Sequence, residues 1–150
     1  MTKWQERIAA IVAGTLAKPR VVEILRTPGI EEWEPGRVQT SWNIDPEFFS
    51  LGGQLFGGYV AALADQVASH AAFTVLDDAT WTRTASLAVY FHNPMREGRL
   101  RIEGRVVAES RTLIHVRVEF RIAGHDRLCA HAEAVLAKAQ QLTPAAPQSA

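Results

Sequence analysis

The sequence has a single cysteine, no excess of either charge and no long apolar run, and each shortage excludes a class of protein. One cysteine, Cys129, excludes an intrachain disulfide framework. Lys and Arg together number 16, as do Asp and Glu, so no net field favours nucleic acid or an anionic membrane. No stretch is apolar over the roughly 20 residues that a membrane helix needs. The ligand classes that remain are a small molecule and another protein.

The length of 150 residues fits one domain with a single hydrophobic core. We assign residues 1–139 to that domain. The tail 140–150, QQLTPAAPQSA, has little to bury and is expected to be disordered. Cys129 lies in the apolar run CAHAEAV, which favours a packing role over a reactive thiol, because apolar burial raises a thiol pKa.

The first 18 residues have the pattern of an amphipathic helix. Trp4, Ile8 and Ile11 recur at helical spacing between polar residues, which predicts a helix over residues 2–16. The Lys18-Pro19 step ends it, because the residue before proline disfavours helical geometry. This pattern and the lack of a clear cleavage site argue against a signal peptide. A cytoplasmic location is therefore expected.

Five segments have strand patterns. The first covers residues 37–44 and ends at Asp45-Pro46. Four more follow, separated by short turn signals, at residues 84–92, 99–108, 112–122 and 128–138. Short turns between such runs predict antiparallel hairpins, and hence a four-stranded meander.

A long, almost uncharged helix is predicted over residues 50–76, opening on a glycine-rich loop that runs to Gly58. Its many alanines leave little side-chain bulk, and a helix that is apolar on nearly every side belongs in an interior. We therefore expect an α+β fold, in which a curved antiparallel sheet wraps around the central helix and an extra helix precedes it.

The start of this helix is a candidate binding site for an oxygen atom. The first amides of a helix lack intrahelical partners and carry the positive end of its dipole, so Gly57 and Gly58 offer donors that a carbonyl oxygen can approach closely. Such donors stabilise the oxyanion formed in acyl transfer. The alternative is that both glycines serve only a tight turn or close helix packing.

Asp65 is the one formal charge in the predicted helix. It lies eight residues after Gly57, or about 12 Å along the axis, too far to act on the same carbonyl. Two antiparallel copies of the helix across a two-fold axis would bring Asp65 of one subunit near Gly57 of the other. Ser69, one turn later, shares its face and could orient a water. Alternatively, backbone amides or a neighbouring hydroxyl donate hydrogen bonds to the Asp65 carboxylate, and the Ser69 hydroxyl forms a hydrogen bond within its own helix.

The remaining polar residues are weaker candidates. The five histidines have no metal-ligand spacing, so no metal is expected. Asn93, just before Pro94, either reaches the site from a strand end or serves a turn.

Taken together, residues 30–139 resemble a hotdog-fold thioesterase, closest to the phenylacetate-degradation type of acyl-CoA thioesterase. In that family a loop with an Asn and a Gly leads to a His-Gly-Gly helix start, followed by Leu-Ala-Asp. The matching positions here are Gly53, Gly57-Gly58, Leu63-Ala64-Asp65 and, on the next strand, Thr84, Phe91 and Pro94. The order of these pieces is more specific than any one of them.

The resemblance implies a homodimer, or a dimer of dimers, that hydrolyses acyl-CoA without a metal or redox cofactor. The Gly57 amide would hold the thioester oxygen beside Gly58, while Asp65 of the partner subunit acts as nucleophile or base and Ser69 assists near the water. Arg111, in the turn at residues 110–112, matches a basic position that could meet a coenzyme A phosphate; its alternative is a solvated turn arginine.

Two departures from the family pattern leave a second function open. Phe56 stands where the family has His, and Ser50 where it often has Asn. Phe56 would then line an apolar acyl pocket. The loss of both polar groups also fits a non-catalytic protein that binds or senses acyl-CoA.

Overall fold

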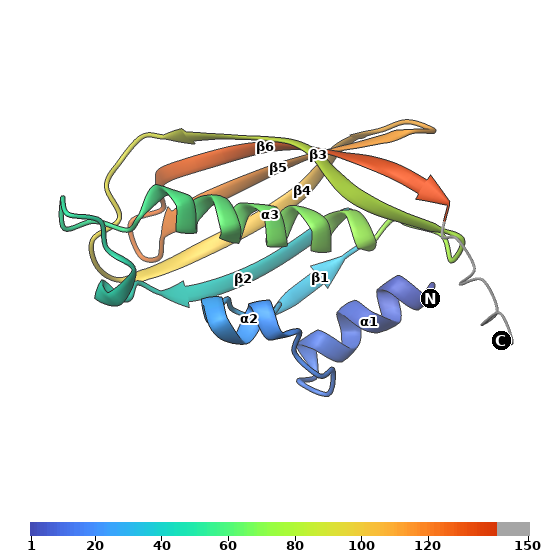
Figure 1. Cartoon of the computed structure of the whole chain (residues 1–150), viewed down its shortest axis with the longest axis horizontal. Coiled ribbons are helices and arrows are strands. Elements are labelled where there is room, and N and C mark those ends of the chain that lie inside the picture. The colour runs from blue at the N-terminus through green and yellow to red at the C-terminus, as the bar shows by residue number, and fades with distance from the viewer. Residues whose placement is uncertain (141–150) are drawn as a thin grey trace, which may run out of the picture.

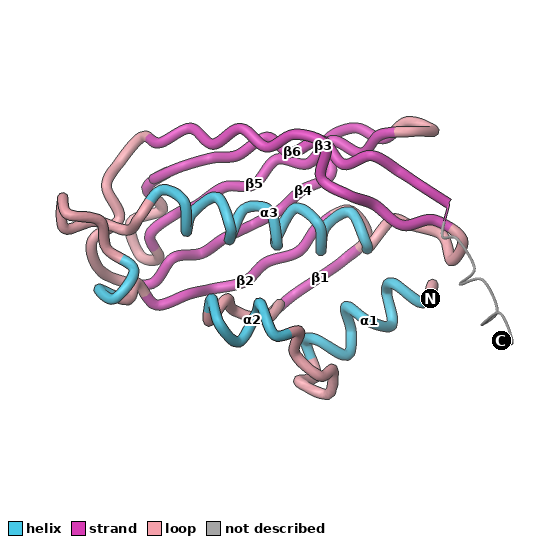
Figure 2. Tube along the Cα trace, viewed as in Figure 1, coloured by secondary structure: helices cyan, strands magenta, loops and turns pink. Residues whose placement is uncertain are grey.

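The computed structural model describes residues 1–140, and its centre is a six-stranded antiparallel sheet with a long helix, α3 (Gly57–Phe73), across one face (Figure 1). The strand order is β1-β2-β4-β5-β6-β3 (Figure 2). The strands are β1 (Glu32–Glu34), β2 (Arg37–Asn43), β3 (Thr80–Phe91), β4 (Arg99–Glu109), β5 (Leu113–Ile122) and β6 (Arg127–Gln140). Gln140, the first residue of the predicted tail, belongs to β6, and the rest of that tail lies outside the described residues.

The strand β3 corrects the predicted meander. The strands β4, β5 and β6 are consecutive neighbours as expected, but β3 pairs with β6 at the sheet edge and β4 pairs with β2. The connection after β3 starts beside β6, where the His92 amide donates to the Cys129 carbonyl (2.8 Å). It ends beside β2, where the Gly98 carbonyl accepts from the Ile44 amide (2.9 Å). Residues 92–98 therefore cross the end of the sheet instead of forming a hairpin.

The central helix is shorter than predicted. Residues 50–56 form a turn in which Ser50 donates to the Gln54 carbonyl (2.8 Å) and Phe56 to the Phe48 carbonyl (2.8 Å), so their amides are used outside a helix. At the other end Thr74 caps the helix, and its hydroxyl donates to the Ala71 carbonyl (2.6 Å). A short 3-10 helix, Pro46–Phe48, precedes this turn.

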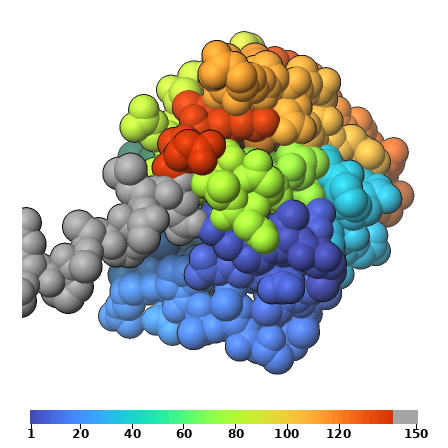
Figure 3. All heavy atoms as spheres, turned by 90° about the vertical axis from the view of Figure 1, so that its right-hand side faces the viewer, coloured from blue at the N-terminus to red at the C-terminus, as the bar shows by residue number. Residues whose placement is uncertain are grey.

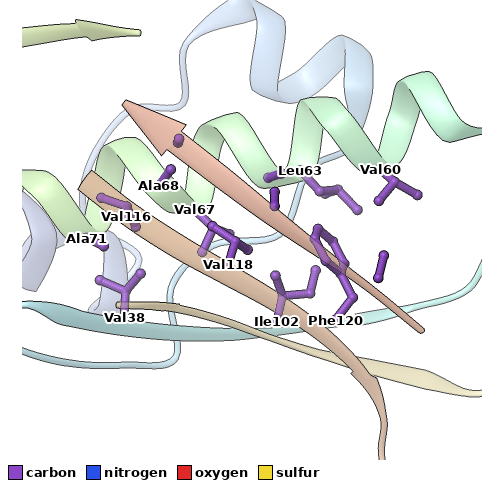
Figure 4. Packing of buried hydrophobic residues seen from close by; sticks show 14 of the residues in the cluster. Val38, Val60, Leu63, Val67, Ala68, Ala71, Ile102, Val116, Val118 and Phe120 are labelled. Carbon is purple, nitrogen blue, oxygen red and sulfur yellow. The ribbon is translucent and has the colours of Figure 1, made fainter. Parts of the chain in front are cut away.

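The face of α3 that meets the sheet consists of small and branched side chains (Figure 4). Ala64, Ala68 and Ala71 are almost fully buried there. One close approach is at Gly104 of β4, where an added Cβ would lie 2.9 Å from Val67 Cγ1 and 3.1 Å from the Val67 carbonyl oxygen. The alanine-rich sequence thus lets the helix backbone lie close to the sheet, as the composition predicted.

The helix α1 (Lys3–Val12) covers the C-terminal half of α3. Thr2 and Gln5 form a capping box at its start, and it ends at Val12 instead of residue 16, because Gly14 turns the backbone into the left-handed region at φ +70°. The Trp4 indole donates to the Thr80 carbonyl (2.7 Å) and stacks on Phe73 at 4.8 Å, which joins the N-terminal segment to the entry of β3 (Figure 3).

Two short elements escaped the sequence-based prediction, and one buried residue agrees with it. The helix α2 (Arg20–Leu25) and the strand β1 were not predicted, because α2 has six residues, none buried, and β1 has three. Cys129 is buried as expected, and burial raises the pKa of its thiol. Among residues 1–140, no helix has the length and hydropathy needed to cross a membrane.

We predict that Gly104→Ala lowers the free energy of unfolding by about 1–3 kcal/mol, because the added methyl group must displace Val67 or the α3 backbone. Denaturant unfolding of the purified protein measures this. Gly52→Ala is the matched control, since its Cβ would meet nothing closer than Ser50 Oγ at 3.7 Å. Equal stabilities of the two variants would contradict the close approach.

We also predict that His70, which lies on α3 beneath α1, makes a contribution to the free energy of unfolding that is lost at acidic pH. Burial lowers the pKa of His70 to about 4, from an ordinary value of 6.5. The unfolded chain therefore binds the proton more readily, so the contribution is complete above about pH 6.5 and is lost as the pH falls towards 4. Between pH 7 and pH 4, the unfolding free energy of His70→Gln should fall less than that of wild type, by about 1–3 kcal/mol. His125→Gln, in an exposed turn, should retain the wild-type dependence.

Candidate active site

The start of α3 presents two unpaired backbone donors, the amides of Gly57 and Gly58, and Gly57 lines a cavity. The Tyr59 and Val60 amides donate to the Phe56 carbonyl (3.0 and 3.2 Å), which closes the first turn. Within residues 1–140, no group accepts a hydrogen bond from the amide of Gly57 or Gly58. These amides carry the positive end of the helix dipole, as the sequence predicted.

The cavity has a volume of about 360 Å³ and lies between the helix start and the connection after β3. Its lining includes Gln54, Gly57, Phe91, His92, Asn93 and Pro94. Leu55 fixes this arrangement, because its amide donates to the Met95 carbonyl (2.9 Å) and ties the loop before α3 to the connection. An added Cβ at Gly57 would come within 3.2 Å of Phe91 Cζ, so a side chain there would narrow the cavity.

Phe56 lies outside this cavity. Its ring covers Gly58, where an added Cβ would stand 2.5 Å from Phe56 Cε1, and 57% of the residue is exposed. Within one chain, the ring is therefore not part of the lining. Ser50 likewise does not line the cavity, although its hydroxyl donates to the carbonyl of the lining residue Gln54 (3.3 Å).

Asp65 lies beside the edge strand β3. The Thr84 hydroxyl donates to its Oδ1 at 2.6 Å. A neighbouring hydroxyl, and not a backbone amide, therefore bonds this carboxylate oxygen. Gly57 and Asp65 belong to the same helix, which keeps them about 12 Å apart along its axis within one chain. Ser69 follows one turn later on the Asp65 side, where its side chain is partly buried.

The strand β3 is twelve residues long and pairs on one side only, with β6, among the described strands. Trp81, Tyr90 and Phe91 on it are 41%, 50% and 54% exposed. Natural proteins rarely leave a long apolar strand edge open to solvent. Asp65 therefore stands next to a surface that is suited to pairing with another chain.

Asn93 has both ends of its amide engaged. Its Nδ2 donates to the Leu128 carbonyl (2.7 Å), and its Oδ1 accepts from the Arg127 guanidinium. The side chain thus holds the connection to β6 while it lines the cavity. Arg111 lies at the opposite end of the sheet, in the turn between β4 and β5, so a single chain does not bring it to Gly57.

His92 is a cavity residue that the sequence reasoning passed over. Its Nε2 lies 2.7 Å from Nδ1 of His131, and Tyr90 stacks on the same His131 ring. Burial, then Arg117 and His92, lower the pKa of His131. The only sequence signal was the position of His92 directly before Asn93-Pro94. Among residues 1–140, no three His, Cys, Asp or Glu side chains are grouped to hold a metal ion.

A helix lying across a six-stranded antiparallel sheet, with bare glycine amides at its start, defines a hotdog thioesterase fold. Residues 52–135, more than half of the chain, match the model of the Thioesterase superfamily. A relative from Saccharolobus solfataricus, provisionally named an esterase, is 35% identical over 112 residues, which are 73% of each protein. The chain belongs to the thioesterase superfamily and is a hydrolase of thioesters or esters.

Solved structures confirm the predicted fold. A thioesterase family protein from Silicibacter pomeroyi is 27% identical, with a TM-score of 0.76 over 89% of this chain and 99% of that one. A phenylacetic acid degradation-related protein from Ralstonia eutropha is 24% identical, with a TM-score of 0.75 over 87% of this chain and 98% of that one. The second likeness bears on the fold alone.

Proposed function

We propose that the protein hydrolyses acyl-CoA thioesters at a site shared by two subunits. The observation that carries the proposal is the unpartnered amide of Gly57, which opens on a cavity of about 360 Å³, with the unpartnered amide of Gly58 next to it. Membership of the thioesterase superfamily supports the reaction class. Coenzyme A is part of the substrate, and the proposed reaction uses no metal or redox cofactor.

The glycine amides are proposed to bind the thioester carbonyl oxygen. Attack on the carbonyl carbon turns this oxygen into an oxyanion, and preformed donors stabilise that charge more than they stabilise the neutral carbonyl. The loss of one such donor typically costs a few kcal/mol of activation free energy. The glycines suit this role because a side chain at Gly57 would lie against Phe91 in the cavity.

Asp65 of the partner subunit is proposed to act on the acyl carbon. As a base, it removes a proton from water while the water oxygen attacks; as a nucleophile, it attacks directly and water then cleaves the anhydride. In both routes the tetrahedral oxyanion collapses and expels the coenzyme A thiolate. The Thr84 hydroxyl donates to Oδ1 of the carboxylate, which leaves Oδ2 to act as the base or nucleophile. Ser69 would help to orient the water.

A two-fold dimer is proposed because one chain keeps Gly57 and Asp65 on the same helix, about 12 Å apart. The open edge of β3 beside Asp65 supplies a surface for such pairing. Antiparallel pairing would also carry the partner's Arg111, at the far end of the sheet, towards this cavity, where it would meet a coenzyme A phosphate. A dimer of dimers would retain the same two sites in each pair.

A non-catalytic acyl-CoA-binding or sensing protein is the second candidate. The observation that favours it is Phe56, an exposed ring over Gly58 at the position of a polar family residue. This function requires saturable binding of acyl-CoA without turnover. His92 argues for the enzyme, because it brings a polar ring to the cavity from another element.

We predict turnover when thiol release is followed with short, long and aromatic acyl-CoAs, phenylacetyl-CoA among them. Asp65→Asn should lower kcat at least 100-fold, since acid-base groups contribute about 10²–10⁴-fold. Asp78→Asn, a matched change whose side chain accepts from the Lys3 amide, should stay near wild type. An unchanged rate in Asp65→Asn would remove its assigned role, and binding without turnover would favour the second candidate.

We further predict that two inactive variants restore activity in mixed dimers. Gly57→Val blocks the cavity side of a site and Asp65→Asn removes the carboxylate. In a randomly assembled equal mixture, half of the dimers pair one variant with the other, and each has one intact composite site. The mixture should therefore reach about one-quarter of wild-type activity per chain. Each variant alone is the control, and a mixture as inactive as its parts would place both groups in one subunit.

A further inference from the structure

A second cavity, of about 350 Å³, lies between α1, the segment that follows it and α3. Trp4, Ile8 and Ile11 of α1 line one side, Val22 of α2 another, and Phe73 of α3 the floor. These side chains give it a predominantly apolar interior of a size that holds small organic ligands. The Gln66 amide bonds the Pro28 carbonyl (2.9 Å), which fixes the segment that closes this cavity over α3.

This cavity is separate from the candidate active site. The two share no lining residue. On α3, Gln66 and His70 face the second cavity, whereas Asp65 faces Thr84 of β3. A molecule in one cavity therefore does not occupy the other.

The charged residues at the second cavity are all cationic. Arg7 and Lys18 line it and are exposed to solvent, and neither forms an ion pair within residues 1–140. Many arginines elsewhere are paired, such as Arg37 with Glu103 (2.8 Å) and Arg99 with Glu31 (2.9 Å). No Asp or Glu belongs to the described lining. Two unpaired cations beside an apolar chamber are complementary to a molecule with an apolar body and one negative end.

His70 leaves the interior uncharged. Burial lowers its pKa to about 4, so the ring is neutral at pH 7. No described residue makes a hydrogen bond with the ring, which therefore retains a polar edge inside the lining. The cationic charge is thus confined to the exposed side chains of Arg7 and Lys18.

We propose that this cavity is a second, non-catalytic site for a free monocarboxylic acid. A medium-length aliphatic chain or a single aromatic ring would fill the apolar interior, and the carboxylate would meet Arg7 and Lys18. This is the chemical class of acid that thioester hydrolysis releases, so the site would respond to product. Binding itself does not depend on the proposed reaction and is measured without acyl-CoA.

Titration calorimetry of the full-length protein with octanoate and with 1-octanol tests the site. We expect one octanoate per chain, bound at least 5-fold more tightly than octanol at low salt. Val22→Phe, which fills the cavity, should weaken octanoate binding at least 10-fold. Val21→Phe is the matched control, because Val21 is next to Val22 in the sequence but is 58% exposed and lies outside the lining. The octanoate affinity of Val21→Phe should stay within 2-fold of wild type.

Charge variants complete the test. The double variant Arg7→Gln, Lys18→Gln should remove the preference for octanoate over octanol, while Arg20→Gln, an exposed arginine outside the lining, should retain it. Gly57→Val should still bind octanoate, which distinguishes this site from the candidate active site. Equal binding by Val22→Phe and Val21→Phe, or equal affinity for octanoate and octanol, would overturn the proposal. Because the charge variants alter exposed side chains only, they decide the question even if Val22→Phe fails to fold.

Discussion

The close contact between α3 and the sheet is the constraint on which the rest of the structure depends. At Gly104 the helix comes so near β4 that even a Cβ would overlap Val67. Such an approach requires small residues on both surfaces, which Gly104, Ala68 and Ala71 provide. A larger residue on either surface would lift the helix and change the position of everything that it carries.

That contact sets the places of the glycine amides and of the carboxylate. Because α3 is fixed along the sheet, its first turn lies against the connection after β3, where Leu55 and Met95 are joined by a backbone hydrogen bond. The same placement brings Asp65 to Thr84 on the open sheet edge. The helix thus carries bare amides at one end and a carboxylate about two turns further on, and in the proposed dimer a second helix of opposite direction would bring the two together.

Periodicity in the sequence was sufficient to predict most elements and an α+β fold with a helix across a curved sheet, because alternation and alanine content record which faces are buried, while the hotdog fold was implied by the family resemblance. It could not predict the neighbours of β3, since antiparallel pairing with β4 or β6 requires the same alternation. Short elements such as β1 left no pattern to recognise. Gly57, Gly58 and Asp65 were candidates from their chemistry and spacing, and their roles stay predictions, whereas His92 was not singled out, because its partner His131 is distant in sequence.

The two sides of α3 have different chemical surroundings. Asp65 faces a strand edge that is open to another subunit, whereas Gln66 and His70 face a chamber closed by α1 and α2. The turns of helix that carry Asp65, Gln66 and His70 join these surroundings mechanically, because a rigid helix cannot shift towards α1 without moving the carboxylate relative to β3.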